Sequence, residues 1–225
     1  MNKERKNAMV LNLNKNGIYL GDVRINWEDA LTLKSVLETQ YHTPVSSLKQ
    51  LIIRIDSPDF LLIPKEFQDD LYTFGLMQIG LGENALKGKE IHSNFLNGLD
   101  SFMNFAIPSN WKDLMALELP MTTLIYEHGL TEKLKNLKKE DILEVYHHEN
   151  FIYVLLQLNG KLELVNYFEF QSSLELSFYI HSIRESYQIN LDSHFVNHHG
   201  LEKLDEEFKK ELQELNILSK FEINE

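Results

Sequence analysis

The chain has 225 residues, of which 43% are hydrophobic and 25% charged, and this average composition predicts a folded protein with a buried core. Its formal net charge of −12 argues against binding to nucleic acid or to an anionic membrane, because both require a basic surface. The absence of cysteine excludes disulfides, thiolate metal sites and a cysteine nucleophile.

The beginning of the chain bears on the cellular compartment. Residues 1–7 are charged or polar apart from the initiating methionine, and the apolar residues that follow are soon interrupted by Asn12, Asn14 and Asn16. This pattern is too broken for the core of a signal peptide. No apolar stretch approaches the roughly 20 residues that span a bilayer. We therefore expect a cytoplasmic protein that does not insert into a membrane.

The first half of the chain, residues 1–139, is predicted to begin with a β-hairpin. The turn Asn14–Gly17 lies between two alternating apolar runs, and its Asn-Gly pair tolerates positive φ. Apolar residues at helical spacing predict a helix over residues 27–40. The other elements predicted in this half are strands at 51–55 and 60–63, a short helix at 65–74, a loop at 75–89, strands at 91–96 and 101–107, a helix at 108–117, a strand at 124–128, and a helical or linking segment at 130–139.

The second half, residues 140–225, has the clearer pattern. Asn159-Gly160 is a two-residue hairpin turn, and Ser172 or Ser173 is predicted to cap a helix. The predicted elements are strands at 141–147, 151–158 and 161–170, a helix ending near 188, a strand at 191–197, and a helix at 201–215. A crossover helix favours a parallel return of the fourth strand beside the first.

This order, three strands, a helix, a strand and a helix, is that of the ribonuclease H-like core. The first half shows a less regular version of it, without a visible sequence repeat. We therefore predict an α/β protein of two similar βββαβα-type halves with mixed sheets, which together give an actin-like architecture. The predicted boundary between the halves lies near Lys139.

Short motifs spread over most of the chain support this fold class. The chain resembles the bacterial domain-of-unknown-function family numbered 3822, which is found mainly in Bacteroidetes and grouped with actin-like ATPases and actin-like pilus-assembly proteins. The order and spacing of the motifs carry the resemblance, which covers most of residues 10–200. The matching stretches are 60–67, 105–108, His128 before a helix, 159–162, 166–168 and 178–179. The resemblance implies a fold and no particular reaction.

An actin-like ATPase needs turns that present backbone N–H groups to phosphate, an aspartate near Mg²⁺, and glycines where adenosine meets the backbone. The corresponding positions in this chain hold only fragments of that pattern, and neither a Walker A loop nor a dinucleotide fingerprint is present. We therefore predict a degenerate nucleotide site and no cofactor, with ATP and Mg²⁺ as the alternative. The candidate residues are Asn14, Asn16, Gly17, Glu149, Asn150 and Gly200.

Histidines gather at the predicted carboxyl ends of two strands in the second half. His148 and His198 are the candidate ligands for a metal such as Zn²⁺, with Glu149 to complete the set and His194 inside the fourth strand. Because neighbouring side chains on a strand point to opposite faces, each histidine pair offers one ligand per face. Solvated or core-edge histidines are therefore the competing interpretation.

Besides metal binding by the histidines, two functions stay open from the sequence. The first is a non-catalytic interaction or scaffold protein, which meets a protein partner or a second copy of itself through the cleft between the halves or through the amphipathic tail 201–223. The second is a nucleotide-binding protein or weak ATPase of the actin-like superfamily. The lack of catalytic motifs favours the first function, in which the protein is not an enzyme.

Overall fold

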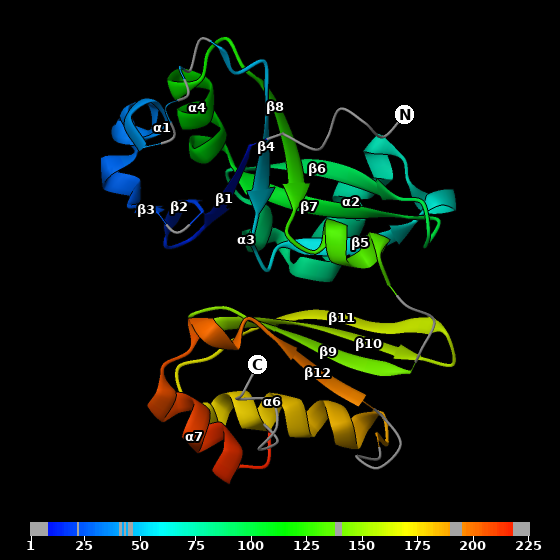
Figure 1. Ribbon diagram of the computed structural model, residues 1–225. Coiled ribbons are helices and arrows are strands. Elements are labelled where there is room, and N and C mark those ends of the chain that lie inside the picture. The colour runs from blue at the N-terminus through cyan, green and yellow to red at the C-terminus, as the bar shows by residue number, and fades with distance from the viewer. Residues whose placement is uncertain are drawn as a thin grey trace. The chain divides into compact units, whose positions relative to one another are not determined.

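The computed structural model describes residues 9–21, 23–40, 42, 44, 47–137, 141–189 and 195–217 (Figure 1). The chain divides into two compact units, Met1–Asn136 and Leu137–Glu225. The boundary residue Lys139 and the strand residue His194, both singled out by the sequence, lie outside the described residues. None of the described helices is long and apolar enough to cross a membrane.

The main sheet of the first unit has five strands in the order β3-β2-β1-β4-β8. Strand β2 pairs antiparallel with β1 and with β3, whereas β4 runs parallel to β1 and β8 runs parallel to β4. This is the ribonuclease H-like arrangement, which the sequence of the first half predicted from a less regular pattern. The strands are β1 (Val10–Asn14), β2 (Gly17–Leu20), β3 (Val23–Ile25), β4 (Gln50–Ile55) and β8 (Thr123–His128).

Alternation of apolar and polar residues fixes which face of this sheet is buried. In β1 the side chains of Leu11 and Leu13 are fully buried, and in β4 those of Leu51 and Ile53 are fully buried, while the residues between them are partly exposed. A period of two residues places these leucines and isoleucines on one face of the sheet. The short strands therefore gain most of their stability from one shared apolar face.

A second, three-stranded sheet is inserted in the chain between β4 and β8. It has the order β5-β7-β6, and both pairings are antiparallel. Its strands are β5 (Phe60–Pro64), β6 (Lys89–Leu96) and β7 (Ser101–Pro108). Helices α2 (Asp70–Leu81) and α3 (Glu83–Leu86) pack on this sheet through Met77, Leu86 and Ala106. The predicted loop at residues 75–89 is therefore wrong, because tertiary packing stabilises helices in a segment whose glycines weaken the helical pattern.

The remaining helices of the first unit are short. The predicted helix at 27–40 consists of a 3₁₀ segment followed by an α-helix, and the helix predicted at 65–74 is split in the same way between a 3₁₀ turn and the start of α2. Pro108 ends β7 and immediately precedes α4, where its missing N–H costs little. The elements are η2 (Trp27–Thr32), α1 (Leu33–Gln40), η4 (Lys65–Phe67), α4 (Ser109–Glu118) and α5 (Thr131–Lys135).

The second unit has a four-stranded sheet in the order β11-β10-β9-β12. The strands are β9 (Ile142–His147), β10 (Phe151–Leu158), β11 (Lys161–Glu169) and β12 (Phe195–His199). Strand β12 runs parallel to β9, which confirms the predicted return of the fourth strand. At the hairpin between β10 and β11, Asn159 and Gly160 have φ values of 53° and 70°, as a type I′ turn requires.

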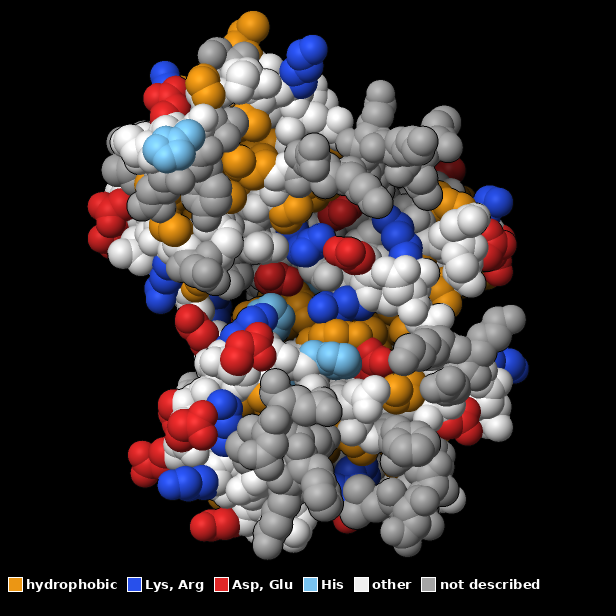
Figure 2. Space-filling view, in the orientation of Figure 1, with side chains coloured by type: hydrophobic (Ala, Val, Ile, Leu, Met, Phe, Trp, Pro, Cys, Tyr) orange, Lys and Arg blue, Asp and Glu red, His pale blue; other side chains and the backbone are white. Residues whose placement is uncertain are grey.

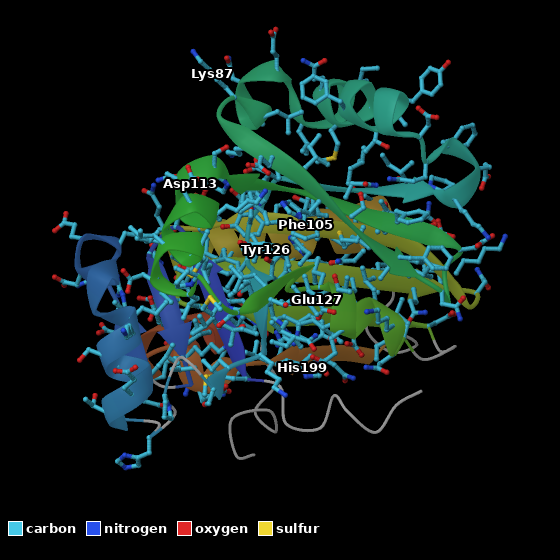
Figure 3. The ribbon with its side chains drawn as sticks, turned by 90° about the horizontal axis from the view of Figure 1, so that it is seen from above. Lys87, Phe105, Asp113, Tyr126, Glu127 and His199 are labelled. Carbon is cyan, nitrogen blue, oxygen red and sulfur yellow. The ribbon has the colours of Figure 1, made fainter. Side chains whose placement is uncertain are left out.

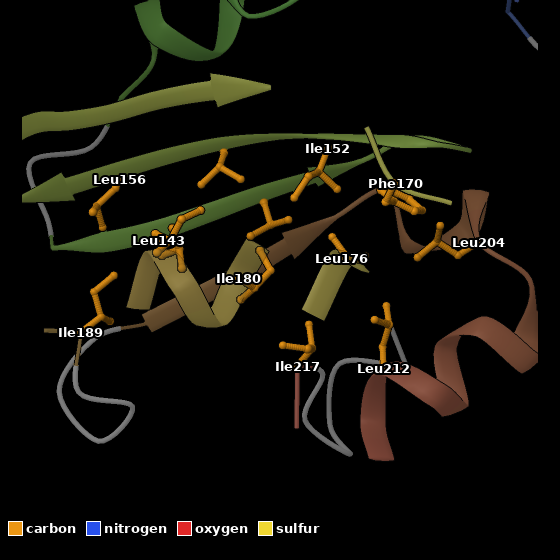
Figure 4. Packing of buried hydrophobic residues seen from close by; sticks show 13 residues of the cluster. Leu143, Ile152, Leu156, Phe170, Leu176, Ile180, Ile189, Leu204, Leu212 and Ile217 are labelled. Atoms are coloured by element: carbon orange, nitrogen blue, oxygen red, sulfur yellow. The ribbon is translucent and has the colours of Figure 1, made fainter. Parts of the chain in front are cut away.

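Helix α6 (Ser173–Ser186) covers one face of this sheet. The hydroxyl of Ser172 accepts a hydrogen bond from the N–H of Glu175, so Ser172 is the cap that the sequence offered as one of two choices. Figure 4 shows the apolar cluster between the sheet and the helices, to which Leu143, Ile152 and Ile180 contribute.

The C-terminal segment also packs into this cluster. The helix predicted at 201–215 is interrupted, with a 3₁₀ turn η5 (Leu201–Lys203) and helix α7 (Glu206–Glu214), which Asp205 caps by accepting from the N–H of Phe208. Leu212 is fully buried in the cluster. Charged side chains of both signs cover the outer side of α7 (Figure 2). The apolar side of the tail is therefore used inside the unit as far as residue 217, and the rest of the predicted tail lies outside the described residues.

Candidate functional site

Each unit has one place where ligands bind in open α/β sheets. After β1 the chain moves to β2 on one side, whereas β4 lies on the other side of β1, so the topology switches direction between β1 and β4. The same switch occurs between β9 and β12 in the second unit. Ligand crevices in such folds form outside the carboxyl ends of the strands at this point. The sequence-predicted residues lie at these two edges.

The turn that ends β1 is held together by groups of the chain itself. The side-chain oxygen of Asn14 accepts a hydrogen bond of 2.8 Å from the N–H of Asn16. The backbone oxygen of Asn14 accepts from the indole N–H of Trp27 at 2.9 Å, and that of Asn16 accepts from the guanidinium of Arg24 at 3.0 Å. The N–H of Asn16, which the sequence offered as a phosphate donor, is thus already used within the turn.

Gly17 has a structural reason to be glycine. Its φ is +149°, and a Cβ at this position would stand 2.5 Å from the backbone oxygen of Ile25. The backbone of β3 therefore passes too close for any side chain. Trp27, which closes the same turn, stacks on Trp111 with ring centroids 4.5 Å apart. At Gly17 the turn therefore packs against β3 and does not leave its backbone open on that side.

The central position of this edge belongs to Asp56, which sequence reasoning did not select. Asp56 follows β4 directly, is partly exposed, and its N–H donates to the oxygen of Leu13 at 2.8 Å. Gly129 follows β8, and its N–H donates to the oxygen of Ile55 at 2.8 Å. A Cβ on Gly129 would stand 1.9 Å from Oδ1 of Asp56, so the carboxylate lies directly over this glycine. The signal in the sequence is that each residue comes immediately after an apolar strand.

His128, which the family resemblance singled out, is a buried neutral imidazole. The N–H of Leu130 donates to Nδ1 at 3.2 Å, so the ring proton is on Nε2, which lies 3.0 Å from the oxygen of Ser57. The rings of Phe60 and Phe105 pack against it. Burial lowers its pKa to about 4. His128 is therefore uncharged at neutral pH and ties β8 to the segment that follows β4.

Asn94 of the inserted sheet completes this connection. Its side-chain oxygen accepts from the N–H of His128 and from the hydroxyl of Thr131, each at 3.1 Å. Its side-chain nitrogen donates to the oxygen of Tyr126 at 3.0 Å. A single amide side chain thus joins β6 to β8 and to the start of α5. These polar groups are structural, because each has its partner within the unit.

A second aromatic group lies further along β8 and β6. The ring of His92 packs against those of Tyr126 and Phe105, with centroid distances of 4.9 and 6.0 Å. Figure 3 labels Tyr126 and Phe105. Burial lowers the pKa of His92 and raises the pKa of Tyr126. Both groups are therefore neutral at pH 7 and behave as packing residues between β6 and β8.

In the second unit, the predicted site residues Glu149 and Asn150 form the turn between β9 and β10. The N–H of Phe170 donates to the oxygen of Asn150 at 3.1 Å, and Glu149 is exposed. The ring of His148 stacks on Phe151 with centroids 4.2 Å apart. The turn has no glycine, and its partners come from β10 and the end of β11.

The histidine that meets His198 is His147 rather than His148. Nε2 of His147 lies 2.8 Å from Nδ1 of His198, because both side chains extend on the face of the sheet that carries Val145 and the apolar cluster. Burial, reinforced by the neighbouring imidazoles, lowers the pKa of His147 to about 3. In the part of the chain that the structure describes, no group of three or more histidine or acidic side chains is placed to hold a metal ion.

His199 points to the opposite face of β12. Its ring stacks on Tyr146 with centroids 4.5 Å apart, and Nε2 lies 3.5 Å from the carboxylate of Glu144. The hydroxyl of Tyr146 donates to the same carboxylate. Burial, reinforced by Glu144, raises the pKa of Tyr146. The two histidines at the end of β12 therefore belong to different surroundings, one apolar and one acidic.

Gly200 follows β12 directly and lies at the carboxyl edge of the second sheet. Its φ is +79°, and a Cβ would stand 2.6 Å from the backbone oxygen of His147. The sequence suggested that a glycine here admits adenosine to the backbone. In the structure the close approach is made by the chain's own carbonyl at the end of β9.

Comparison with known proteins identifies the family and the fold. The family described as "Protein of unknown function (DUF3822)" matches residues 6–216. A protein from Bacteroides thetaiotaomicron with an actin-like ATPase fold and unknown function is similar in structure, with a TM-score of 0.70 and 17% sequence identity, over 93% of this chain and 86% of that chain. This likeness confirms the predicted actin-like fold and shows the fold alone.

Two other solved structures are more distant. The PilM–PilN type IV pilus biogenesis complex matches with a TM-score of 0.47 and 11% identity, over 92% of this chain and 86% of that chain. The cytoplasmic domain of EpsL, an inner membrane component of the type II secretion system of Vibrio cholerae, matches with a TM-score of 0.43 and 10% identity, over 95% of each chain. No curated protein matches the sequence.

Proposed function

We propose that this chain, which belongs to the DUF3822 family of proteins of unknown function, is a non-catalytic interaction or scaffold protein built on an actin-like fold. One observation carries the proposal: the glycines and the turn at the two ligand-binding edges are packed against the chain's own backbone. A nucleotide site needs these positions to be open, because phosphate and adenosine must reach bare backbone groups.

Three contacts support this reading. At the first edge, the N–H of Asn16 donates to Asn14, and Gly17 lies against the backbone of β3. At the second edge, Gly200 lies against the carbonyl of His147. A ligand that approached Gly17 or Gly200 on the side where these contacts lie would have to displace backbone, which costs more than moving a side chain.

Calorimetric titration with ATP and with ADP in the presence of Mg²⁺ tests the catalytic half of the proposal. At about 1 mM nucleotide, which half-fills a site of about 1 mM Kd, we expect no heat of binding and no rise in melting temperature. Phosphate release should equal that of a heat-denatured sample. Saturable binding of either nucleotide would overturn the argument that the two edges do not admit a nucleotide, and hydrolysis would overturn the non-catalytic proposal.

The interaction half requires a partner that binds with defined stoichiometry. We expect the protein, purified from its own cells at native abundance, to bring one other protein in fixed ratio, and the purified pair to re-form the complex. Leu174→Ser combined with Phe178→Ser changes two exposed apolar residues one helical turn apart on α6 and serves to locate the contact. Recovery of the chain without any protein in fixed ratio contradicts this half.

Nucleotide binding remains the second candidate function, and Asp56 is the observation that favours it. This carboxylate lies partly exposed at the switch point beside Gly129, where an actin-like site would organise Mg²⁺. If nucleotide binds, Asp56→Asn should weaken the Mg²⁺-dependent part of the binding at least tenfold. The control Asp100→Asn changes an exposed acidic residue in the turn before β7 and should leave binding unchanged.

A further inference from the structure

Helix α2 carries an apolar side that points away from the unit to which it belongs. Its inner side holds the buried residues Thr73 and Met77, and Met77 packs with Ala106 of the inserted sheet. On its outer side Tyr72 and Ile79 are 71% and 85% exposed. In Figure 3 the side chains of this teal helix project outward from the sheet. A helix that is apolar on its exposed side is typical of a contact surface.

Gly75 lies between these two exposed residues on the outer side of α2. It follows Tyr72 by three residues and precedes Ile79 by four, which places all three on one side of the helix. Apart from its chain neighbours and the nearby backbone of α2 itself, no described heavy atom lies within 4 Å of the position that a Cβ on Gly75 would occupy. Glycine weakens the interior of a helix, and no close neighbour in this unit requires it here. A glycine at such a position permits the backbone of another helix to approach closely.

The charge of the chain indicates which partner suits this surface. Residues 71–82 include no charged residue, although the chain as a whole has a net charge of −12. Two copies of so acidic a protein repel each other over most of their surfaces. Beyond Asp70 at its first position, α2 carries no charge, so a second copy meets the least repulsion there. A basic partner would find no acidic side chains to pair with on this stretch.

The arrangement about Gly75 is also self-complementary. If two α2 helices cross antiparallel with Gly75 at the two-fold axis, Tyr72 of each copy lies against Ile79 of the partner subunit. Such isologous contacts are the rule for two-fold dimers. Since a large apolar or aromatic side chain buries about 150–250 Å² when fully covered, the exposed parts of Tyr72 and Ile79 offer on the order of 300 Å² per copy. This is less than half of a standard interface of roughly 800 Å² per partner and fits a weak dimer.

We propose that α2 is the contact surface of a homodimer in which two copies of the chain pair antiparallel through Tyr72, Gly75 and Ile79. The proposal goes beyond the proposed function, since it holds equally for a nucleotide-binding protein. We expect a Kd on the order of 10 μM, at the weak end of the range for protein interfaces, because the area is well below the standard size. Added salt strengthens it, because salt screens the repulsion between the two acidic copies.

Sedimentation equilibrium of the full chain at about 50 mM and about 500 mM NaCl tests the proposal. We expect a monomer–dimer equilibrium that shifts toward dimer at high salt. Gly75→Leu and Ile79→Asp should each raise the Kd at least tenfold. Gly75→Leu keeps the monomer folded, because the added side chain meets no described neighbour and leucine favours helix. The control Leu117→Asp changes an apolar residue that is 69% exposed on α4 and should leave the Kd unchanged.

Cross-linking tests the geometry independently, because the chain has no cysteine of its own. In the Gly75→Cys variant, mild oxidation with a copper–phenanthroline complex should join two copies by a disulfide, since the two Cα atoms at a two-fold axis lie within about 7 Å. The control variant Leu117→Cys, with its cysteine on exposed α4, should form no disulfide-linked dimer under the same conditions.

Three outcomes overturn the proposal. The first is a wild-type chain that stays monomeric at high salt at a concentration of about ten times the expected Kd. The second is a dimer that is insensitive to both Gly75→Leu and Ile79→Asp, which places the interface elsewhere. The third is a monomer that floats with neutral phosphatidylcholine vesicles and loses this binding in Ile79→Asp, which assigns α2 to lipid.

Discussion

The carboxyl edges of the two sheets differ in chemistry although their strands follow the same order. In the first unit the edge carries Asn14, Asp56 and Gly129, and the obstacle above Gly129 is a carboxylate side chain. In the second unit the edge carries His147 and Gly200, and the group that lies against Gly200 is the backbone carbonyl of His147. A side chain can rotate away from a ligand, whereas a backbone group moves only with its strand.

One strand order thus produces two edges that differ in how easily they can adapt to a ligand. Each unit also buries one neutral histidine near its edge, but the two rings are satisfied differently. Both ring nitrogens of His128 lie at hydrogen-bonding distance from backbone groups, whereas Nδ1 of His147 has no hydrogen-bond partner among the described residues. The first unit thus uses its histidine as a connector, and the second packs its histidine against another imidazole.

The sharpest test of this difference replaces each histidine with leucine. His128→Leu should lower the free energy of unfolding by about 4 kcal/mol, because it leaves the buried oxygen of Ser57 and N–H of Leu130 without partners at about 2 kcal/mol each. His147→Leu should cost about 1 kcal/mol. The loss of the hydrogen bond to His198 is partly offset by the removal of Nδ1, which is buried without a partner among the described residues. Urea unfolding at pH 7 measures both values. Equal losses would contradict the distinction between connector and packed ring.

Acid should destabilise the fold through the same histidines. The pKa of His128 is about 4 in the folded chain against 6.5 in the reference state, so the unfolded chain takes up the proton first as the pH falls. The contribution of neutral His128 to the free energy of unfolding is complete above pH 6.5. It decreases by about 3 kcal/mol as the pH falls to about 4. Urea unfolding at several pH values checks this, and the loss should be smaller in His128→Leu. A stability that does not change between pH 6.5 and 4.5 would sink the assignment.

The closed edge of the second unit can be probed at Gly200. Gly200→Ala should cost about 2 kcal/mol more than Gly160→Ala, because both glycines have positive φ but only Gly200 faces a backbone oxygen. Gly160 has no described atom within 4 Å of its Cβ position, so it isolates the cost of the left-handed backbone. Thermal unfolding of the two variants gives the difference. Equal costs would show that the carbonyl of His147 moves aside easily.

At the edge of the first unit, a substitution of the glycine should destabilise the fold less, and a second substitution at Asp56 should remove the effect. Gly129→Ala should cost about 1 kcal/mol, because the new Cβ displaces the carboxylate of Asp56 rather than backbone. In an Asp56→Ala background the same change should cost almost nothing. A double-mutant cycle measures this coupling. Additive costs would mean that Gly129 is required by something other than Asp56.

Local sequence patterns were enough to predict several elements. Asn159-Gly160 forms the hairpin that the pair predicts, and Ser172 caps α6 as a serine before an apolar stripe should. The strand and helix order of the second half was also sufficient to predict that β12 returns parallel to β9. These features depend on backbone preferences and on the handedness of crossovers, which act over short stretches of chain.

The candidate site was predicted only in part. Asn14, Gly17 and Gly200 do lie at the carboxyl edges, but the sequence did not show that their own units cover the glycines. Asp56 was missed because its place at the switch point depends on which strand lies beside β1. The pairing of His147 with His198 was missed for a similar reason, since the register between β9 and β12 decides which histidines share a face.

The sequence by itself determined the class of fold, the hairpin turns, the cap of α6 and the amphipathic character of α7. Only the tertiary structure decided that residues 75–86 are mainly helical, that the described tail packs inward, and that the edges are closed by backbone and side-chain contacts. The physical reason is the range of the interactions. Turns and caps are set by neighbours in sequence, whereas burial and close approach depend on residues that only folding brings together.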